Sequence, residues 1–135
     1  LAMTAAETGH LVLATVHTAS AAKTIDRLVD VFSGDEKNKV RTQLSESLTA
    51  VISQTLCKRD DGRGRVAAHE VMVATPAIRN LIREAKVAQM YSAIQTGQAQ
   101  GMQTLDQHLQ RLLQQGLIRL TEAQMHARHP ESLCA

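Results

Sequence analysis

Thr8-Gly-His-Leu-Val-Leu-Ala-Thr-Val-His-Thr-Ala-Ser20 has the pattern of a buried β-strand that leads into a helix. Leu11 to Val16 is almost wholly apolar, as are parallel strands that are covered on both faces. His17, Thr18 and Ser20 follow this apolar run. Because ligands of open α/β sheets bind beyond the carboxyl ends of the strands, these three residues form the first candidate site.

The side chains at this corner suit contact with an anion. An imidazole beside two hydroxyl groups can contact a phosphate or an attacking water molecule. Two plainer interpretations stay open: His17 can simply belong to a turn, and Ser20 can serve only as the N-cap of the next helix. His10 lies seven residues earlier, on the opposite face of an unbroken strand, so we expect it to have a structural or interface role.

The composition fits one domain, or part of one, with an aliphatic core. Of the 135 residues, 44% are hydrophobic, and Phe32 and Tyr91 are the only Phe, Tyr or Trp residues. So few aromatic rings, together with a net charge of +2, argue against nucleic-acid binding. No apolar run approaches the roughly 20 residues of a membrane-spanning helix, so we expect no membrane insertion.

The two cysteines do not indicate a metal site. Cys57 and Cys134 are the only ones, which is typical of free thiols in a reducing compartment. The spacing of Cys57, His69 and Cys134 does not support a zinc site. We therefore predict no metal site made by this chain alone.

Local signals in the first half of the chain predict two further elements after the helix that begins at Ser20. Apolar periodicity predicts a long helix from Val40 to about Cys57, followed by a turn at 60–64. Residues 65–74 alternate as a strand that lies within a sheet rather than at its edge. Glu70 is the charged residue of that strand, and its burial would require a partner or the end of the sheet.

The second half has the signals of short helices. Thr75-Pro76 begins one helix, and Thr104-x-x-Gln107 is a capping box that begins another. Between them, the apolar pattern predicts a helix over 87–95. Thr121-x-x-Gln124 begins a last short helix, and the tail after Pro130 is expected to fray.

Two strings of this sequence resemble the signatures of a known family. Residues 7–21 resemble the histidine box of the secretion-type hexameric ATPases, and Ala77-Ile-Arg-Asn-Leu-Ile-Arg-Glu84 resembles the C-terminal signature of the PilT family of pilus retraction motors. Residues 45–56 and 86–96 are also similar to that family. The resemblance covers nearly the whole chain, in order and without large gaps.

The resemblance implies an α/β fold: the C-terminal portion of a RecA-like P-loop ATPase domain with a helical C-terminal bundle. Residues 1–75 would be a partial ATPase core and residues 76–135 the helical C-terminal region. The sequence has no G-x-x-x-x-G-K-[ST] loop and no acidic strand end to serve as Walker B. The chain also opens at Leu1, so we expect it to be the C-terminal part of a longer protein.

The function implied is that of a homo-hexameric motor that powers type IV pilus retraction and twitching motility by ATP hydrolysis. ATP and Mg²⁺ would be held mainly by residues absent from this chain, so the chain alone is predicted to be inactive. The implied location is cytoplasmic, peripheral at the inner-membrane base of the pilus. The implied partners are the inner-membrane platform protein and the pilus machinery.

The resemblance also assigns candidate roles to residues. His17 would lie near the γ-phosphate of ATP and act in phosphate sensing or in positioning water, with Thr18 beside it. Arg27 and Arg65 are candidates to contact nucleotide across a subunit boundary, or else ordinary surface arginines. Glu7, His10 and Ser20 are secondary members of the histidine box.

The second signature would couple hydrolysis to retraction through contact with a neighbouring subunit or the platform protein. Arg79, Arg83 and Lys86 have the spacing of one basic stripe on a helix, which without the resemblance would indicate a solvated face. The residues of this signature are Ala77, Ile78, Arg79, Asn80, Leu81, Ile82, Arg83 and Glu84.

Two alternatives remain. The chain could be a non-catalytic helical interaction module, as the missing Walker motifs would suggest. It could also be the same part of a pilus-extension or type II secretion ATPase. Those relatives often carry a four-cysteine zinc insert, and residues 57–65 contain no C-x-x-C, which favours the retraction branch.

Overall fold

A long, twisted β-hairpin organises the computed structural model, which describes residues 1–135. Strand β1 (Ala50–Lys58) pairs antiparallel with β2 (Arg65–Val73), in a register that runs from Ala50 opposite Val73 to Lys58 opposite Arg65. Gly62 and Gly64 have φ values of 71° and 91°, a region that favours glycine, so they allow the chain to reverse between the strands.

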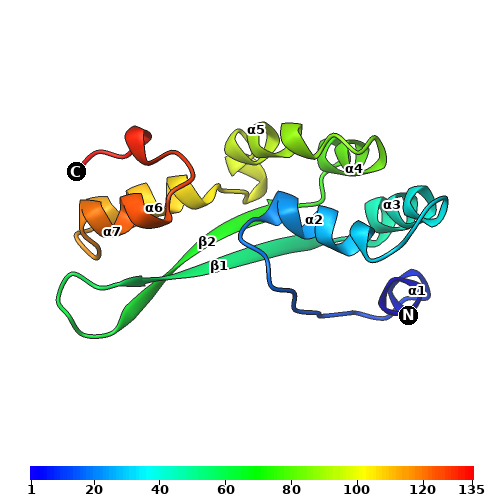
Figure 1. Cartoon of the computed structure of the whole chain (residues 1–135), viewed down its shortest axis with the longest axis horizontal. Helices are drawn as coiled ribbons and strands as arrows, with labels where there is room; N and C mark the ends of the chain where they lie inside the picture. Colours follow the sequence, from blue (N-terminus) through cyan, green and yellow to red (C-terminus); the bar gives the residue numbers. More distant parts are fainter.

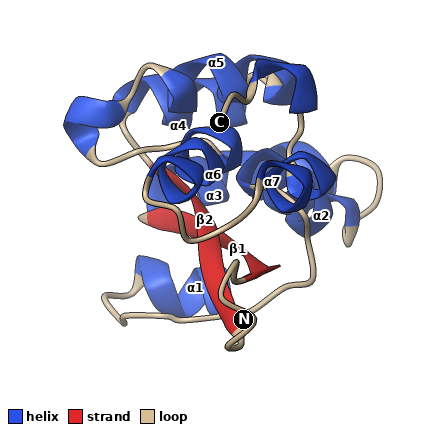
Figure 2. Cartoon of the chain, turned by 90° about the vertical axis from the view of Figure 1, so that its left-hand side faces the viewer, coloured by secondary structure: helices blue, strands red, loops and turns tan.

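The two faces of the hairpin differ. On the inner face, Ser53, Cys57, Ala68, Glu70 and Met72 are buried. The outer face carries Ile52 opposite Val71 and Leu56 opposite Ala67, and Ile52 is 66% exposed. Figure 1 shows why: most of the helices lie along one side of the hairpin, while α1 lies on the other, and Figure 2 shows the same arrangement end-on.

Seven α-helices and three short 3₁₀ turns surround the hairpin. The α-helices are α1 (Ala2–Glu7), α2 (Ala21–Asp30), α3 (Glu36–Ser47), α4 (Pro76–Arg83), α5 (Met90–Gln95), α6 (Leu105–Gln114) and α7 (Leu120–His126). The 3₁₀ turns are η1 (Val87–Gln89), η2 (Gln98–Gln100) and η3 (Pro130–Ser132). None of the helices is long and apolar enough to cross a bilayer.

The core consists of two separate apolar clusters. The first joins α2, α3 and β2 to α4 and α5, through Ala21, Ala22, Ile25, Val29, Val40, Leu44, Met72, Ile78, Ile82, Met90, Ile94 and Met102. The second joins the hairpin near its turn to α6 and α7, through Cys57, Ala68, Leu109, Leu112, Ile118, Ala123 and Leu133. Both clusters draw residues from either side of position 75, so the division into 1–75 and 76–135 stays a prediction.

The predicted helix from Val40 to Cys57 is wrong in its second half. Helix α3 ends at Ser47, and Leu48 has the extended φ and ψ values of −69° and 134°. The β-branched residues Val51, Ile52 and Thr55 suit a strand, and the turn at 60–64 brings 65–73 alongside to pair with them. The same pairing leaves β2 in a two-stranded hairpin rather than inside a larger sheet.

The predicted buried strand over Leu11–Val16 is also wrong for this chain. Residues 11–19 form no strand, and none of their backbone groups takes part in a backbone–backbone hydrogen bond. Leu11 and Leu13 are 86% and 88% exposed. The strands pair with each other, and β2 also forms an isolated bridge to Gln103, but residues 11–19 form backbone hydrogen bonds with neither strand.

The helix signals of the second half are mostly confirmed. Thr75 caps α4, and the capping box of Thr104 and Gln107 begins α6. The predicted start at Thr121 is wrong, because α7 begins at Leu120 without a side-chain cap.

The C-terminal tail is docked rather than frayed. Leu133 is buried in the second apolar cluster. The side-chain amide of Gln110 donates to Cys134 O at 2.8 Å and accepts from Cys134 N at 3.1 Å. The carboxylate of Asp106 accepts from the backbone N–H groups of Arg128 and His129, both at 2.8 Å.

Candidate functional site

The corner at residues 17–20 is held by hydroxyl groups and leaves the imidazole free. Ser20 Oγ accepts from Lys23 N at 3.1 Å, which confirms Ser20 as the N-cap of α2. Thr24 Oγ1 donates to Ser20 O at 2.9 Å, so the 2.5 Å contact between Thr18 and Thr24 is a hydrogen bond donated by Thr18. His17 is exposed and forms no side-chain hydrogen bond within the chain. The corner therefore presents His17 to groups outside it.

The other histidine of the box belongs to the end of α1. His10 Nδ1 lies 3.2 Å from Ala5 O and 3.3 Å from Thr8 Oγ1. Glu7 is the last residue of α1 and is exposed. The structure thus places Glu7 and His10 at one end of the extended segment and His17 at the other.

Arg27 and Arg65 are exposed and form no ion pair. Arg27 lies in the last turn of α2, and Arg65 begins β2 directly opposite Lys58. No hydrogen bond joins either guanidinium to the corner at 17–20. Two cations facing each other across a strand pair repel, so Arg65 suits an anionic partner.

The second signature forms α4 and the residue that follows it. Ile78 and Ile82 are fully buried in the first apolar cluster. Arg79 faces α3, where Nη1 donates to Ser45 O at 2.7 Å and to Glu46 O at 3.0 Å. These carbonyls belong to the last turn of α3, so Arg79 caps the C-terminal end of that helix.

The predicted basic stripe of Arg79, Arg83 and Lys86 is wrong. Helix α4 ends at Arg83, and Ala85 then adopts a φ of 58°, which turns the chain away from the helix axis. Lys86 pairs with Glu84 at 3.0 Å. Arg83 is exposed and unpaired, so it is the one arginine of the signature that is available for external contact.

Glu70 has a connecting position that the sequence analysis did not assign. Glu70 is 5% exposed, and its Oε1 accepts from Ala21 N at 2.9 Å while its Oε2 accepts from Leu105 N at 3.2 Å. The expectation that Glu70 needs a partner is confirmed. The need for a partner could be predicted because Glu70 is a charged residue on the apolar face of a strand. Which two N–H groups it would bind could not be predicted, because they are brought to Glu70 by the tertiary fold.

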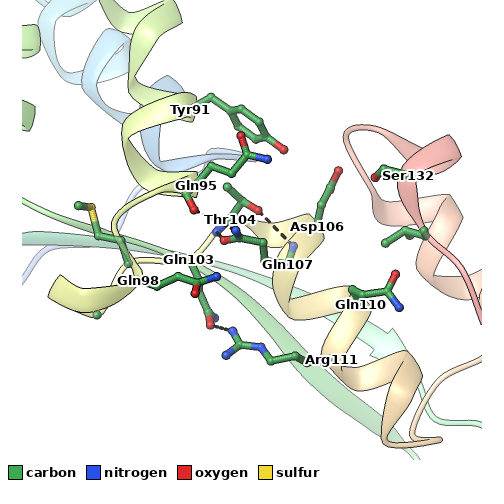
Figure 3. Close-up of a pocket in the computed structure, with 13 residues that line it drawn as sticks. Tyr91, Gln95, Gln98, Gln103, Thr104, Asp106, Gln107, Gln110, Arg111 and Ser132 are labelled. Atoms are coloured by element: carbon green, nitrogen blue, oxygen red, sulfur yellow. Dashed lines mark hydrogen bonds between the residues drawn. The ribbon is translucent and has the colours of Figure 1, made fainter.

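A groove of about 560 Å³ lies between α5, α6 and the tail, and it is rich in glutamine (Figure 3). Three of these side chains hold the chain's own backbone. Gln107 accepts from Thr104 N and donates to Gln95 O, Gln103 donates to His69 O, and Gln110 pairs with Cys134. The glutamine side chains that line the groove thus hold the tail and the start of α6 in place.

The chain's own residues do not form a complete nucleotide or metal site. No group of three or more His, Cys, Asp and Glu side chains is arranged to hold a metal ion. Within the corner, the free imidazole of His17 fits contact with a phosphate oxygen, but residues 17–20 offer no positively charged side chain beside it.

Comparisons with known proteins agree over nearly the whole chain. A family model described as type II/IV secretion system protein matches residues 1–61. A twitching motility protein of Neisseria gonorrhoeae is 62% identical over 133 residues, which cover 98% of this chain and 36% of that protein. The type IV pilus retraction ATPase PilT of Pseudomonas aeruginosa is 67% identical over 132 residues, which cover 98% of this chain and 38% of that protein.

The fold agrees as well. A crystal structure of the pilus retraction motor PilT with bound ADP superposes with a TM-score of 0.86 and 45% identity, over 98% of this chain and 36% of that chain. The chain is similar to PilT-type pilus retraction ATPases. It spans a little more than a third of the length of these relatives and corresponds to their C-terminal part. The match to the PilT structure confirms the expected fold class, the C-terminal portion of a RecA-like ATPase domain with its helical bundle.

Proposed function

We propose that this chain is the C-terminal part of a hexameric ATPase that drives type IV pilus retraction, and with it twitching motility, by ATP hydrolysis. The observation that carries the proposal is the identity of more than 60% to a twitching motility protein and to a retraction ATPase over 98% of the chain. The PilT structure with bound ADP supports nucleotide as the ligand. We assign the protein to the cytoplasmic face of the inner membrane, with the platform protein of the pilus as its partner.

His17 is the residue that we assign to the nucleotide site. Its exposed imidazole and the hydrogen-bonded corner behind it support contact with the γ-phosphate of ATP, with Thr18 fixing the corner. Arg27 and Arg65 are exposed and unpaired, which suits a contact across a subunit boundary. ATP and Mg²⁺ would be held mainly by residues outside 1–135, and residues 1–75 and 76–135 would serve as the ATPase part and the helical part.

Residues 77–84 would couple hydrolysis to movement. Arg79 holds α3, so a change in the position of α3 reaches α4 directly. Arg83 is free for contact with a neighbouring subunit or the platform protein. This gives the two arginines of the signature separate tasks.

The experiment is phosphate release by the full-length ATPase that contains this sequence. We expect Mg²⁺-dependent turnover, and we expect His17→Ala to lower it by about tenfold or more while the ring stays assembled by light scattering. His129→Ala, at another exposed histidine, is the control and should leave turnover unchanged. An absence of turnover in the wild-type protein would favour the non-catalytic module, and full turnover by His17→Ala would remove His17 from the site.

A further inference from the structure

Two helices in the structure begin in the same way. Ser20 caps α2 by accepting from the third residue of the helix, Lys23, and Thr104 caps α6 by accepting from Gln107. In both helices the first backbone N–H, of Ala21 and of Leu105, is left without a capping side chain of its own. Such N–H groups require an acceptor when they are buried.

Glu70 supplies both acceptors from a single carboxylate. Oε1 takes the N–H of Ala21, and Oε2 takes the N–H of Leu105. The positive ends of two helix dipoles meet at one buried negative charge, a favourable arrangement for each helix. Glu70 is buried, at 5% exposed, and its two oxygens are bonded to one carbon, so they cannot move independently.

Glu70 is the only residue that joins these helices by hydrogen bonds. Helix α2 packs in the first apolar cluster, whereas α6 packs in the second through Leu109 and Leu112. No other hydrogen bond or ion pair connects α2 to α6 directly. The carboxylate therefore links two helices that pack in different apolar clusters.

The bridge begins beside the candidate site. Ala21 directly follows the corner at residues 17–20, and Leu105 directly follows the capping residue of α6. We propose that Glu70 is a positioning residue: it couples the histidine corner to α6, so that displacement of the first turn of α2 is transmitted to the first turn of α6. The catalytic consequence rests on the function proposed for His17, but the coupling itself does not.

Glu70→Gln is the substitution that separates the two helices. Glutamine has nearly the same volume, but only one of its two terminal atoms accepts a hydrogen bond, and the other would present N–H to N–H. Asp106→Asn is the matched control. Asp106 is 7% exposed and also holds two backbone N–H groups, of Arg128 and His129, but both belong to the tail.

The coupling is tested by amide hydrogen exchange in the 135-residue chain. Ser20→Ala loosens the start of α2, and we expect it to speed exchange at the Leu105 amide by about fivefold while the amides of Arg128 and His129 keep their rates. In the Glu70→Gln variant, adding Ser20→Ala should leave the exchange rate of the Leu105 amide unchanged. If Ser20→Ala does not change the exchange rate of the Leu105 amide when Glu70 is present, the proposal is overturned. This measurement does not depend on the folding of the Gln variant.

The consequence for turnover is tested in the full-length ATPase. Glu70→Gln should lower kcat by about tenfold with KM for ATP within about twofold, whereas Asp106→Asn should leave both within about twofold. Equal effects of the two variants would reduce Glu70 to a stabilising residue and contradict the proposal. A wild-type protein without turnover would instead refute the proposed function, and the exchange experiment would still decide the coupling.

Discussion

Two segments of this molecule have the apolar residues expected of a strand, but only one of them forms a strand. Residues 11–16 are almost wholly apolar, yet they are unpaired, and Leu13 is 88% exposed. Strand β2 carries His69 and Glu70 among its nine residues, yet it pairs over its whole length and buries Met72 completely. Apolar content alone did not decide which segment became a strand; a pairing partner did.

The difference extends to how each region is held. The extended segment is fixed at its ends, by α1 near His10 and by the cap of α2 at Ser20. The hairpin is fixed along its length by pairing and by helices packed on one face. Substitutions at residues that the structure holds should therefore have larger effects than substitutions at residues that it does not hold.

The largest effect is expected in the core. Met72→Ala, at a fully buried residue of β2, should lower the free energy of unfolding by about 3 kcal/mol, since it removes buried apolar contacts and leaves a cavity. Leu13→Ala should change it by less than about 0.5 kcal/mol. Urea unfolding of the 135-residue chain measures both, and a similar loss in the two variants would show that residues 11–16 are packed after all.

The two arginines of α4 offer the next contrast. Arg79→Ala should destabilise the chain by about 2 kcal/mol, because two carbonyls at the end of α3 lose a charged donor. Arg83→Ala should have little effect on stability, because Arg83 has no partner within the chain. Both are measured by urea unfolding, and equal losses would refute the separate tasks assigned to them.

A smaller effect of opposite sign is expected just after α4. Ala85 has a φ of 58°, a conformation that costs an L-residue about 1 kcal/mol and glycine almost nothing. Ala85→Gly should therefore raise the thermal midpoint. Ala88→Gly, in η1 with an exposed side chain, is the control and should not. A lower midpoint for Ala85→Gly would mean that this strain is absent in solution.

The smallest effect concerns pH. Burial, followed by the charges of Arg111 and His69, lowers the pKa of His108, whose Nδ1 accepts from His69 N at 2.8 Å. Because the folded-state pKa lies below the unfolded value, the unfolded chain takes up the proton first as pH falls, and stability declines. His108→Gln keeps an acceptor without titrating, so its unfolding midpoint should fall less between pH 7.5 and pH 5.5, which spans the ordinary histidine pKa of about 6.5. If the unfolding midpoints of the wild-type chain and of His108→Gln fall by the same amount over this pH range, the proposed contribution of His108 is contradicted.

Local signals were sufficient for some elements. Thr75-Pro76 and the Thr104–Gln107 box predicted the starts of α4 and α6 because each signal acts through neighbouring backbone groups. Residues 50–57 were predicted as the second half of a helix because Leu48, Val51 and Thr55 share a helical spacing by coincidence. Only pairing with 65–73 made them a strand.

The candidate site was predictable in part. The pattern around His17 located the corner and its cap, but the long-range partners of Arg79 and Glu70 lie 34 and 49 residues away. No local pattern specifies such contacts, because they depend on how the hairpin and helices pack together. The need of Glu70 for a partner was visible in the sequence, whereas its role as a bridge was not.

Amide hydrogen exchange of the unmodified 135-residue chain tests the central claim, that the histidine segment has no pairing partner within residues 1–135. We predict that the amides of Val12, Ala14 and Val16 exchange at nearly unprotected rates, while those of Ala68 and Met72 in β2 exchange at least about a thousandfold more slowly. Protection of Val12, Ala14 and Val16 equal to that of β2 would contradict the account.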